Sequence, residues 1–300
     1  MPDRDDLAAR FETHRPHLRA VAYRMLGSLD EAEDVVQDAW LRASRAETAS
    51  VENLAGWLTT IVARLSLDRL RTRRSRREDP IDVSIPDPIL SSVDGVNPEQ
   101  EALLAESVGL AMLIVLETLS PAERLAFVLH DTFGLPFDQI APIVGRTPTA
   151  TRQLASRGRR RVRGATASTE VPLRRQWELV DAFLAASRDG DVRALIHVLD
   201  PDVIVRADAG GGTTALGRTR TVRGPVAVAE QAMGFRHLAP GARRVIVNGG
   251  AGFVVFAGDR PYAVVGFGFN TSAITEIDFL LDPKRLARLD LSMAAGPPGS

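Results

Sequence analysis

The sequence has no cysteine among its 300 residues, and this absence excludes disulfides, thiolate zinc sites, iron–sulfur clusters and a cysteine nucleophile. No apolar run approaches the roughly 20 residues that a membrane-spanning helix needs. The first residues, Met-Pro-Asp-Arg-Asp-Asp, are too acidic and polar for a secretory signal. With 45% hydrophobic and 25% charged residues, the composition is that of a soluble globular protein. We therefore expect a cytoplasmic protein with no membrane partner.

Lysine is nearly absent, since Lys284 is the only one, and arginine supplies the rest of the positive charge. The net charge is only -1, yet seven arginines and a single acid lie between Arg64 and Arg77, and six arginines with no acid lie between Arg152 and Arg163. A guanidinium group suits phosphate oxygens and guanine edges. The two segments either contact DNA at two places or form solvated faces of helices.

The length predicts two or three domains, and the pattern is helical up to about residue 77. Ser28-Leu29-Asp30-Glu31 has the spacing of a capping box, and apolar residues follow it at helical spacing. Residues 78–98 carry four prolines and four aspartates, so we expect an extended acidic linker there, with neither a helix nor a paired strand. The helical period returns from about Glu99, and Ser120-Pro121-Ala122-Glu123 predicts another capped helix.

Residues 135–162 have the pattern of a helix-turn-helix, with a turn at Gly145 and a second helix that starts at Thr147-Pro148. On that helix Arg152, Gln153, Ser156 and Arg157 share an arc of about 140°. Apolar positions and Thr151 lie opposite, so one face can pack while the other reads DNA. A basic surface hairpin without a DNA partner is the alternative. An interior glycine, Gly158, is expected to cost the helix about 1 kcal/mol.

Three stretches resemble the extracytoplasmic-function (group four) sigma factors of bacterial RNA polymerase. RMLGSLDEAEDVVQDAWLRA, residues 24–43, resembles the part of region two that binds the β′ clamp helices of core polymerase. NLAGWLTTIVARLSLDRLRTRRSRR, residues 53–77, resembles the part that melts and reads the minus-ten element. LSPAERLAFVLHDTFGLPFDQIAPIVGRTPTATRQLASRGRRRV, residues 119–162, resembles region four, which reads the minus-thirty-five element. Core polymerase, through its β′ clamp helices and β flap, and promoter DNA are the partners that the resemblance implies.

The resemblance also implies three sets of site residues. The set expected to bind core polymerase is Asp34, Gln37, Asp38, Leu41 and Arg42. The set expected at the minus-ten element is Asn53, Thr60, Arg64, Arg71, Arg73 and Arg74, of which Asn53 could instead cap a helix. The set expected at the minus-thirty-five element is Thr149, Arg152, Gln153, Ser156, Arg157 and Arg160.

About 125 further residues follow region four, with two amphipathic helices and then short β-branched runs separated by glycine-rich turns, which is the pattern of an α+β domain. Their order resembles the SnoaL-like cone-shaped barrels found in one branch of these sigma factors. In that branch the extension tunes polymerase activity in cis, so we expect it to contact the linker and the sigma domains. Two motifs of that branch are present in this sequence in altered form. One lies in the linker and includes Pro86, Asp87 and Pro88. The other lies in the extension and includes Asp208, Gly210, Gly211 and Gly212. The glycines allow either a close approach or a simple hairpin turn.

The barrel is expected to enclose a pocket that could hold a small-molecule ligand. Five phenylalanines are candidates for its lining: Phe235, Phe253, Phe256, Phe267 and Phe269. Acid–base groups would be His197, Asp208, His237 or Asp278, but none is paired by spacing with a second group. We therefore expect no enzyme activity, no cofactor and no metal.

The resulting fold class is multidomain: two all-α sigma domains, the second a helix-turn-helix, followed by an α+β cone-shaped SnoaL-like domain. The expected boundaries are region two at 1–78, linker at 79–98, region four at 99–166, second linker at 167–173, the SnoaL-like domain at 174–293, and a disordered tail at 294–300. Two other functions compete with the sigma factor. One is a DNA-binding regulator with a ligand-sensing domain, and the other is a SnoaL-like isomerase or hydrolase fused to a DNA-binding module.

Overall fold

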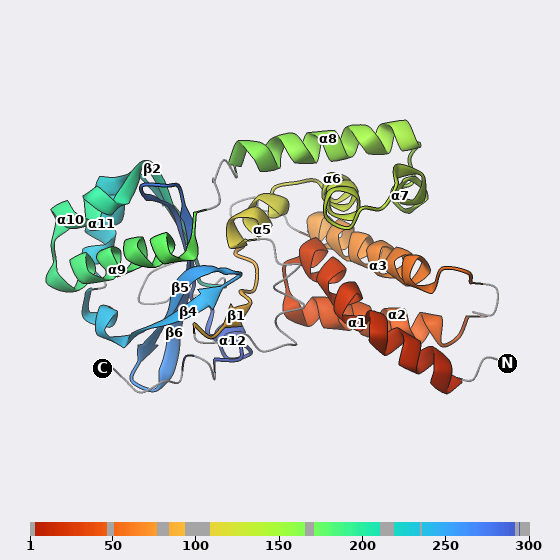
Figure 1. Cartoon of the computed structure of the whole chain (residues 1–300), viewed down its shortest axis with the longest axis horizontal. Coiled ribbons are helices and arrows are strands. Elements are labelled where there is room, and N and C mark those ends of the chain that lie inside the picture. The colour runs from red at the N-terminus through yellow and green to blue at the C-terminus, as the bar shows by residue number, and fades with distance from the viewer. Residues whose placement is uncertain are drawn as a thin grey trace. The chain divides into compact units, whose positions relative to one another are not determined.

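The computed structural model describes residues 4–46, 51–76, 84–93, 109–165, 171–210, 219–234, 236–291 and 294. The chain divides into two compact units (Figure 1). The first contains Met1–Pro80 and Val115–Thr166, and the second contains Ile81–Ile114 and Ala167–Ser300. The segment Ile81–Ile114, which connects the two halves of the first unit, therefore belongs to the second unit.

The N-terminal half of the first unit is a group of three helices, α1 (Arg4–Leu26), α2 (Leu29–Ala43) and α3 (Leu54–Arg76). The predicted cap of α2 is present, because the Ser28 hydroxyl accepts a hydrogen bond from the backbone N–H of Glu31. The apolar stripe of α2 is buried as predicted, and its buried members are Ala32, Val35, Val36, Ala39 and Ala43. The three helices pack on one another, so region two is a helical domain with its polar faces outward.

The C-terminal half of this unit holds the end of α5 (Leu110–Glu117), then α6 (Pro121–Phe127), a π-helical turn η1 (Val128–Thr132), α7 (Phe137–Val144) and α8 (Pro148–Ala165). The capping box predicted at Ser120 is complete, since Ser120 and Glu123 each bond the backbone of the other. Gly145 ends α7 with φ of 73°, a left-handed conformation that glycine adopts at little cost. Helices α7 and α8 form the predicted helix-turn-helix.

The second unit is built on a seven-stranded sheet with the order β1-β4-β5-β6-β7-β2-β3. Two helices, α9 (Leu173–Asp189) and α10 (Val192–Val198), precede most of the sheet, and α11 (Pro225–Gly234) and the 3-10 turn η2 (Arg236–Gly241) interrupt it. The strands are β1 (Leu90–Ser91), β2 (Leu199–Asp208), β3 (Arg220–Arg223), β4 (Ala242–Val247), β5 (Gly250–Ala257), β6 (Arg260–Phe269) and β7 (Ile274–Leu280), and α12 (Pro283–Leu286) follows. Only the β2–β7 pair is parallel among the described strands, so the predicted α+β domain is confirmed.

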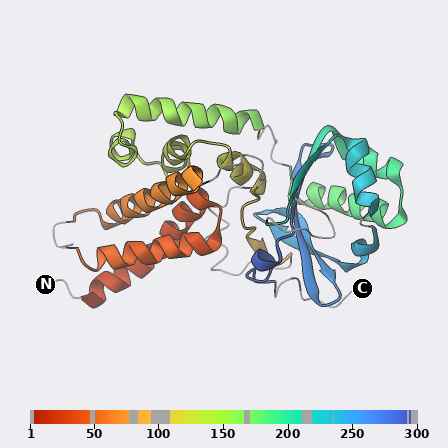
Figure 2. The same ribbon diagram turned by 180° about the vertical axis from the view of Figure 1, so that it is seen from behind.

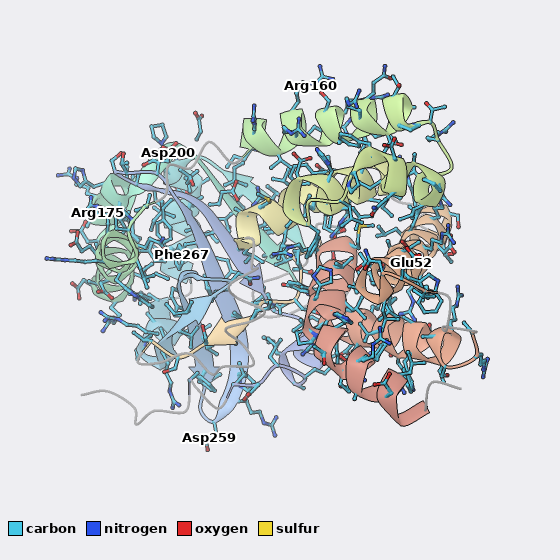
Figure 3. The ribbon with its side chains drawn as sticks, turned by 45° about the vertical axis from the view of Figure 1, so that its right-hand side comes forward. Glu52, Arg160, Arg175, Asp200, Asp259 and Phe267 are labelled. Atoms are coloured by element: carbon cyan, nitrogen blue, oxygen red, sulfur yellow. The ribbon has the colours of Figure 1, made fainter. Side chains whose placement is uncertain are left out.

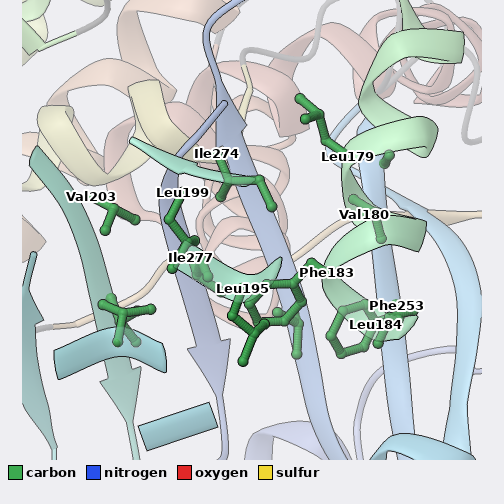
Figure 4. Close-up of a cluster of buried hydrophobic side chains, with 14 of the residues drawn as sticks. Leu179, Val180, Phe183, Leu184, Leu195, Leu199, Val203, Phe253, Ile274 and Ile277 are labelled. Carbon is green, nitrogen blue, oxygen red and sulfur yellow. The ribbon is translucent and has the colours of Figure 1, made fainter. Parts of the chain in front are cut away.

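The two faces of the sheet carry separate apolar clusters, because side chains alternate along each strand. One face packs against α9, α10 and α11 (Figure 2), with Phe183, Leu195, Phe253 and Ile277 among its buried residues (Figure 4). The other face buries Val245, Val247, Val254, Val264 and Leu280 against residues of the linker and of α5. The sheet is thus covered on both sides, and the linker supplies part of the second cover.

The expectation that no strand pairs in the 78–98 linker was wrong. Leu90 and Ser91 pair antiparallel with Val247 and Ile246 of β4, so β1 is an edge strand of the C-terminal sheet. Pairing is possible because these two residues follow the last proline of the described linker, Pro88, and a proline-free pair can join a sheet edge.

Some expectations fall on residues outside those described: the loop at 47–50, the start of the helix expected from Glu99, and Gly211 and Gly212. Residues 295–300 of the expected tail are also outside, whereas Ala294 is buried and its carbonyl accepts a hydrogen bond from Arg243. Within the described residues, no helix has both the length and the apolar character needed to cross a bilayer.

Candidate functional sites

Helix α8 presents two different faces, as its arginine-rich sequence predicts. The six residues predicted to read the minus-thirty-five element are all exposed: Thr149, Arg152, Gln153, Ser156, Arg157 and Arg160. Figure 3 shows Arg160 on the outer side of α8. The opposite face is buried through Thr151, Ala155, Gly158 and Val162. One face therefore anchors the helix while the other offers guanidinium and amide groups to a groove.

Gly158 lowers the intrinsic stability of α8 but is needed for the packing of this helix on α6. A Cβ added there would lie 3.1 Å from Cβ of Phe127 and 3.4 Å from the carbonyl oxygen of Glu123. Helix α8 can approach α6 this closely only where a side chain is missing. The glycine that weakens the helix in isolation thus allows it to dock on the rest of region four.

Two arginines of α8 are bonded to acidic residues within region four. Arg159 bonds Asp131 at 2.7 Å, and Arg161 bonds Glu123 at 3.0 Å. Burial alone would raise the pKa of Glu123, but hydrogen bonds from Ser120 and the charge of Arg161 lower it. These two arginines therefore fix α8 on region four, which leaves Arg152, Arg157 and Arg160 on the face predicted for DNA.

On α3 most residues predicted for the minus-ten element share the exposed side. Arg64, Arg71 and Arg74 are exposed, and the hydroxyl of Thr60 donates to the carbonyl of Gly56. The side-chain oxygen of Asn53 accepts from the backbone N–H of Gly56 at 2.9 Å, so Asn53 caps α3 while it stays exposed. Arg73 lies apart from the others, because it donates to the carbonyl of Leu26 and forms an ion pair with Glu31.

The residues predicted to bind core polymerase gather on α2. Asp34, Gln37, Leu41 and Arg42 are exposed, and Asp38 is half-buried. Arg69 of α3 reaches across to this face, with its guanidinium 3.0 Å from Asp38 and 3.5 Å from Asp34. Sequence reasoning missed Arg69, because its partners lie 31 and 35 residues away and no local pattern connects them.

Regions two and four meet within the first unit at a seam formed by Arg124 and Phe133 of region four and by His17 and Arg24 of region two. The buried Arg124 donates from Nε to the carbonyl of Arg24 at 2.9 Å and forms an ion pair with Glu117 at 2.8 Å. Arg24 lies over the ring of Phe133 at 4.7 Å, and His17 meets the same ring edge-on. Nη2 of Arg124 is buried without a hydrogen-bond partner.

In the second unit, the linker is held by a set of contacts that we name the linker latch: residues Ile85–Ser91 with Asp208, Asn248 and Arg285. The backbone N–H of Ile85 donates to Asp208 at 2.9 Å, and Arg285 donates to the carbonyl of Ile85 at 2.6 Å. Arg285 also bonds Asp87 at 2.6 Å and Asp208 at 2.9 Å. Asn248 exchanges two hydrogen bonds with the backbone of Ile89.

The latch joins two motifs singled out in the sequence, the Pro86-Asp87-Pro88 segment and the loop that starts at Asp208. Gly210 has φ of 62°, and a Cβ added there would lie 2.1 Å from a carboxylate oxygen of Asp282. The close approach expected of this loop is therefore present at Gly210. Arg285, which joins both motifs, stands in no motif and was missed.

The helix-covered face of the sheet encloses an apolar cavity of about 70 Å³, lined by Phe183, Phe253, Phe279, Tyr262 and Ser187 among others. Of the predicted lining phenylalanines, Phe235 is outside the described residues and only Phe253 of the other four borders the cavity. Phe267 and Phe269 pack in the adjoining core. Phe256 lies on the opposite face, as expected from the alternation of side chains along β5, because it follows Phe253 by three residues.

None of the acid–base candidates borders this cavity. His197 and His237 are exposed, whereas Asp208 and Asp278 lie on the linker side of the sheet. In the described part of the chain, no group of acidic residues and histidines could hold a metal ion. The apolar lining is suited to binding rather than to acid–base chemistry.

Comparison with known proteins identifies the two helical regions and finds relatives over most of the chain. Residues 10–76 match the family model of sigma-70 region 2, and residues 111–162 match that of sigma-70 region 4. The chain is 34% identical over 299 residues to a probable ECF RNA polymerase sigma factor SigI of Mycobacterium tuberculosis, which covers 99% of this chain and all of that protein. It is 38% identical over 251 residues to the ECF sigma factor SigJ of the same organism, over 81% of this chain and 79% of that one. The crystal structure of SigJ superposes with a TM-score of 0.74 at 29% identity, over 96% of this chain and 99% of that one.

Proposed function

This chain belongs to the extracytoplasmic-function RNA polymerase sigma factors, and from that premise we propose which of its residues bind promoter and polymerase and how its C-terminal domain modulates it. Such a protein directs core RNA polymerase to specific promoters and is an initiation factor rather than an enzyme. The two competing functions considered for the sequence are therefore set aside.

The exposed arc of α8 is assigned to the minus-thirty-five element, and the exposed residues Asn53, Arg64, Arg71 and Arg74 together with the half-buried Thr60 to the minus-ten element. Arg73 is assigned a supporting role there, because its bonds to Leu26 and Glu31 hold the end of α3. Asp34, Gln37, Asp38, Leu41 and Arg42 are assigned to the β′ clamp helices of core polymerase, with the acids held in place by Arg69. The β flap is proposed as the partner of region four.

Binding both promoter elements requires the two regions to separate. The elements lie about 25 base pairs apart, or roughly 85 Å at about 3.4 Å per base pair. The region models end at residue 76 and begin at residue 111, and the chain between them could reach roughly 115 Å if it were fully extended. The free linker is therefore long enough for simultaneous binding.

The C-terminal domain removes much of this reach because it holds both residues 85–91 and the start of α5, whose Leu110 and Ile114 share the buried cluster of the linker. With both segments held, only about eight residues, or roughly 28 Å of chain, remain between region two and that domain. We infer that the C-terminal domain limits promoter binding in cis by holding the linker and that release of the linker allows initiation. The observation that carries this proposal is the pairing of β1 with β4 together with the three bonds of Arg285.

Run-off transcription with core polymerase and the full-length chain tests the proposal. Arg285→Ala should raise specific initiation, because it opens the latch and leaves the proposed DNA and polymerase faces unchanged. Lys284→Ala, an exposed change on the same helix, is the matched control and should leave transcription at the wild-type level. An Arg285→Ala protein that binds core polymerase normally and initiates no better than wild type would overturn it.

The apolar cavity supports a second proposal, that the C-terminal domain binds a small apolar molecule. Ser187 borders the cavity and its hydroxyl is buried without a hydrogen-bond partner, so a ligand with one polar group on an apolar body suits the site. Benzyl alcohol is a suitable probe in isothermal titration. Ala232→Phe, which fills the cavity from its wall, should abolish the heat. Absence of heat with the wild-type chain would count against the site.

A further inference from the structure

The linker side of the C-terminal sheet holds a buried layer of charged groups. Arg206 of β2 bonds Glu276 at 2.9 Å and Asp278 at 3.0 Å, both on β7. Beside them, Arg285 joins Asp208 and Asp87. The layer thus contains four carboxylates and two guanidinium groups, and the side chain of Asp278 is only 2% exposed. A layer with more carboxylates than cations favours a proton on one of them.

Asp278 is buried by segments that belong to the linker and to α5. Its cross-strand neighbours are Arg206 on β2 and Gly266 on β6. A Cβ added at Gly266 would lie 2.6 Å from a methyl carbon of Leu110, so the start of α5 covers the sheet next to Asp278. The linker is bonded at Asp208 on β2 and again at Asn248 after β4, so it crosses the face that Asp278 shares. Release of the linker together with the start of α5 would therefore bring water to Asp278.

We propose that closure of the linker latch binds a proton at Asp278, so that the sigma factor holds its linker more tightly as the pH falls. Its effect on transcription rests on the cis modulation proposed above, whereas the proton-linked closure itself can be measured without polymerase. The groups that face Asp278 are Arg206 from β2 and Glu276 from its own strand, with Asp208, Arg285 and Asp87 in the adjoining part of the layer. From β6 and α5, the described neighbours are Gly266 and Leu110, which carry no charge.

Burial of Asp278 raises its pKa from 3.8 to about 7, against the lowering effect of Arg206 and with a further rise from Glu276. In an open latch the same carboxyl would return toward its ordinary pKa. The closed state then binds more protons than the open state between about pH 4 and about pH 7. Opening is least favourable below this range, increases up to about tenfold per pH unit through it, and levels off above it.

The absence of cysteine allows a direct measurement of opening on the full-length chain. Ser91 in β1 is fully buried and its hydroxyl has no partner, so Ser91→Cys places a thiol that a reagent reaches only when the latch opens. The labelling rate of S91C divided by that of S91C/D278N, at the same pH, removes the pH dependence of the thiol itself. This ratio should rise more than tenfold from pH 5 to pH 7 and then flatten.

A ratio that stays constant from pH 5 to pH 8 would overturn the proposal. If D278N does not fold, E276Q provides a second measurement, because removal of the neighbouring carboxylate should lower the pKa of Asp278 and move the plateau to lower pH. Unchanged pH dependence in S91C/E276Q would also contradict it. A pH-dependent ratio combined with normal transcription by Arg285→Ala would keep the proton linkage and exclude the cis modulation.

Discussion

The seam between regions two and four and the linker latch hold the chain together by different means. The seam depends on a buried arginine, Arg124, with an ion pair, a hydrogen bond to a carbonyl and one nitrogen that has no partner. The latch combines strand pairing, three bonds from Arg285 and an apolar cluster that includes Ile85, Leu90, Leu110 and Ile114.

The difference indicates which of the two contacts limits the separation of regions two and four. Both contacts contain a largely buried ion pair, which loses most of its attraction to desolvation, and an unpartnered buried polar group, Nη2 of Arg124 in the seam and the Ser91 hydroxyl in the latch. The latch adds strand pairing and an apolar cluster to these, and buried apolar surface contributes roughly 25 cal/mol per Å². We therefore expect the seam to open readily and the latch to open rarely, so that the latch limits the separation of the two regions.

The largest effect is expected from breaking the latch at its centre. Arg285→Ala removes three bonds and leaves Asp87 and Asp208 buried without their cation, which should cost the closed latch about 3–5 kcal/mol. Labelling of S91C should accelerate at least a hundredfold. The control Lys284→Ala should label like wild type, and equal rates for both variants would contradict the role of Arg285.

Breaking the seam should have a smaller effect. Arg124→Met removes the bond to the Arg24 carbonyl and leaves the partly exposed Glu117 unpaired, at about 2–3 kcal/mol. Energy transfer between dyes on cysteines introduced at the exposed Arg45 and Arg146 should fall. Arg163→Ala, at an exposed position of α8, should leave the transfer efficiency unchanged. Labelling of S91C should also stay at its wild-type rate, because the seam and the latch lie in different units.

Weakening the second attachment of the latch sharpens the comparison. Asn248 has φ of 49°, which disfavours alanine, and its side chain accepts from the backbone of Ile89. Asn248→Ala should cost about 2 kcal/mol and accelerate S91C labelling less than Arg285→Ala does. Asn248→Gly, which relieves the backbone strain but also lacks the acceptor, should lie between Asn248→Ala and wild type. If glycine and alanine label equally, the left-handed backbone contributes nothing.

The smallest effect is expected from a change inside region four. Gly158→Ala should gain helix propensity of about 1 kcal/mol but press its Cβ on Phe127, for a net loss of about 1 kcal/mol in unfolding free energy. Thermal melting measures this loss. Labelling at S91C and energy transfer across the seam should both stay at wild-type values, and a stabilised protein would show that α6 moves aside easily.

Local features of the fold were predictable from sequence because their partners are close along the chain. The caps at Ser28 and Ser120, the packed face of α8 and the order of helices and strands all depend on residues within a few positions. The same locality explains the wrong expectation for the linker. The proline density predicted correctly that the linker has little tendency to form secondary structure by itself. Its partner strand β4 lies about 150 residues later in the chain, so no local pattern indicates that the two segments pair.

The unpredicted site residues share one property, which is that their partners are distant. Arg69, Arg124 and Arg285 bond groups that are 31, 100 and 198 residues away. Nothing in their immediate sequence distinguishes them from the arginines of the exposed faces. The cavity lining was mispredicted for a different reason, since the phenylalanines were grouped by residue type, whereas alternation along β5 places Phe253 and Phe256 on opposite faces of the sheet.

Strand β1 also covers the outer edge of β4, whose backbone would otherwise present unpaired N–H and C=O groups. An uncovered edge can pair with a strand of another molecule, and this is a common route to aggregation. In the proposed open state, in which the linker is released from the sheet, that edge would be exposed. The latch thus also protects the protein from self-association, and sustained opening in the absence of core polymerase should be accompanied by a loss of solubility.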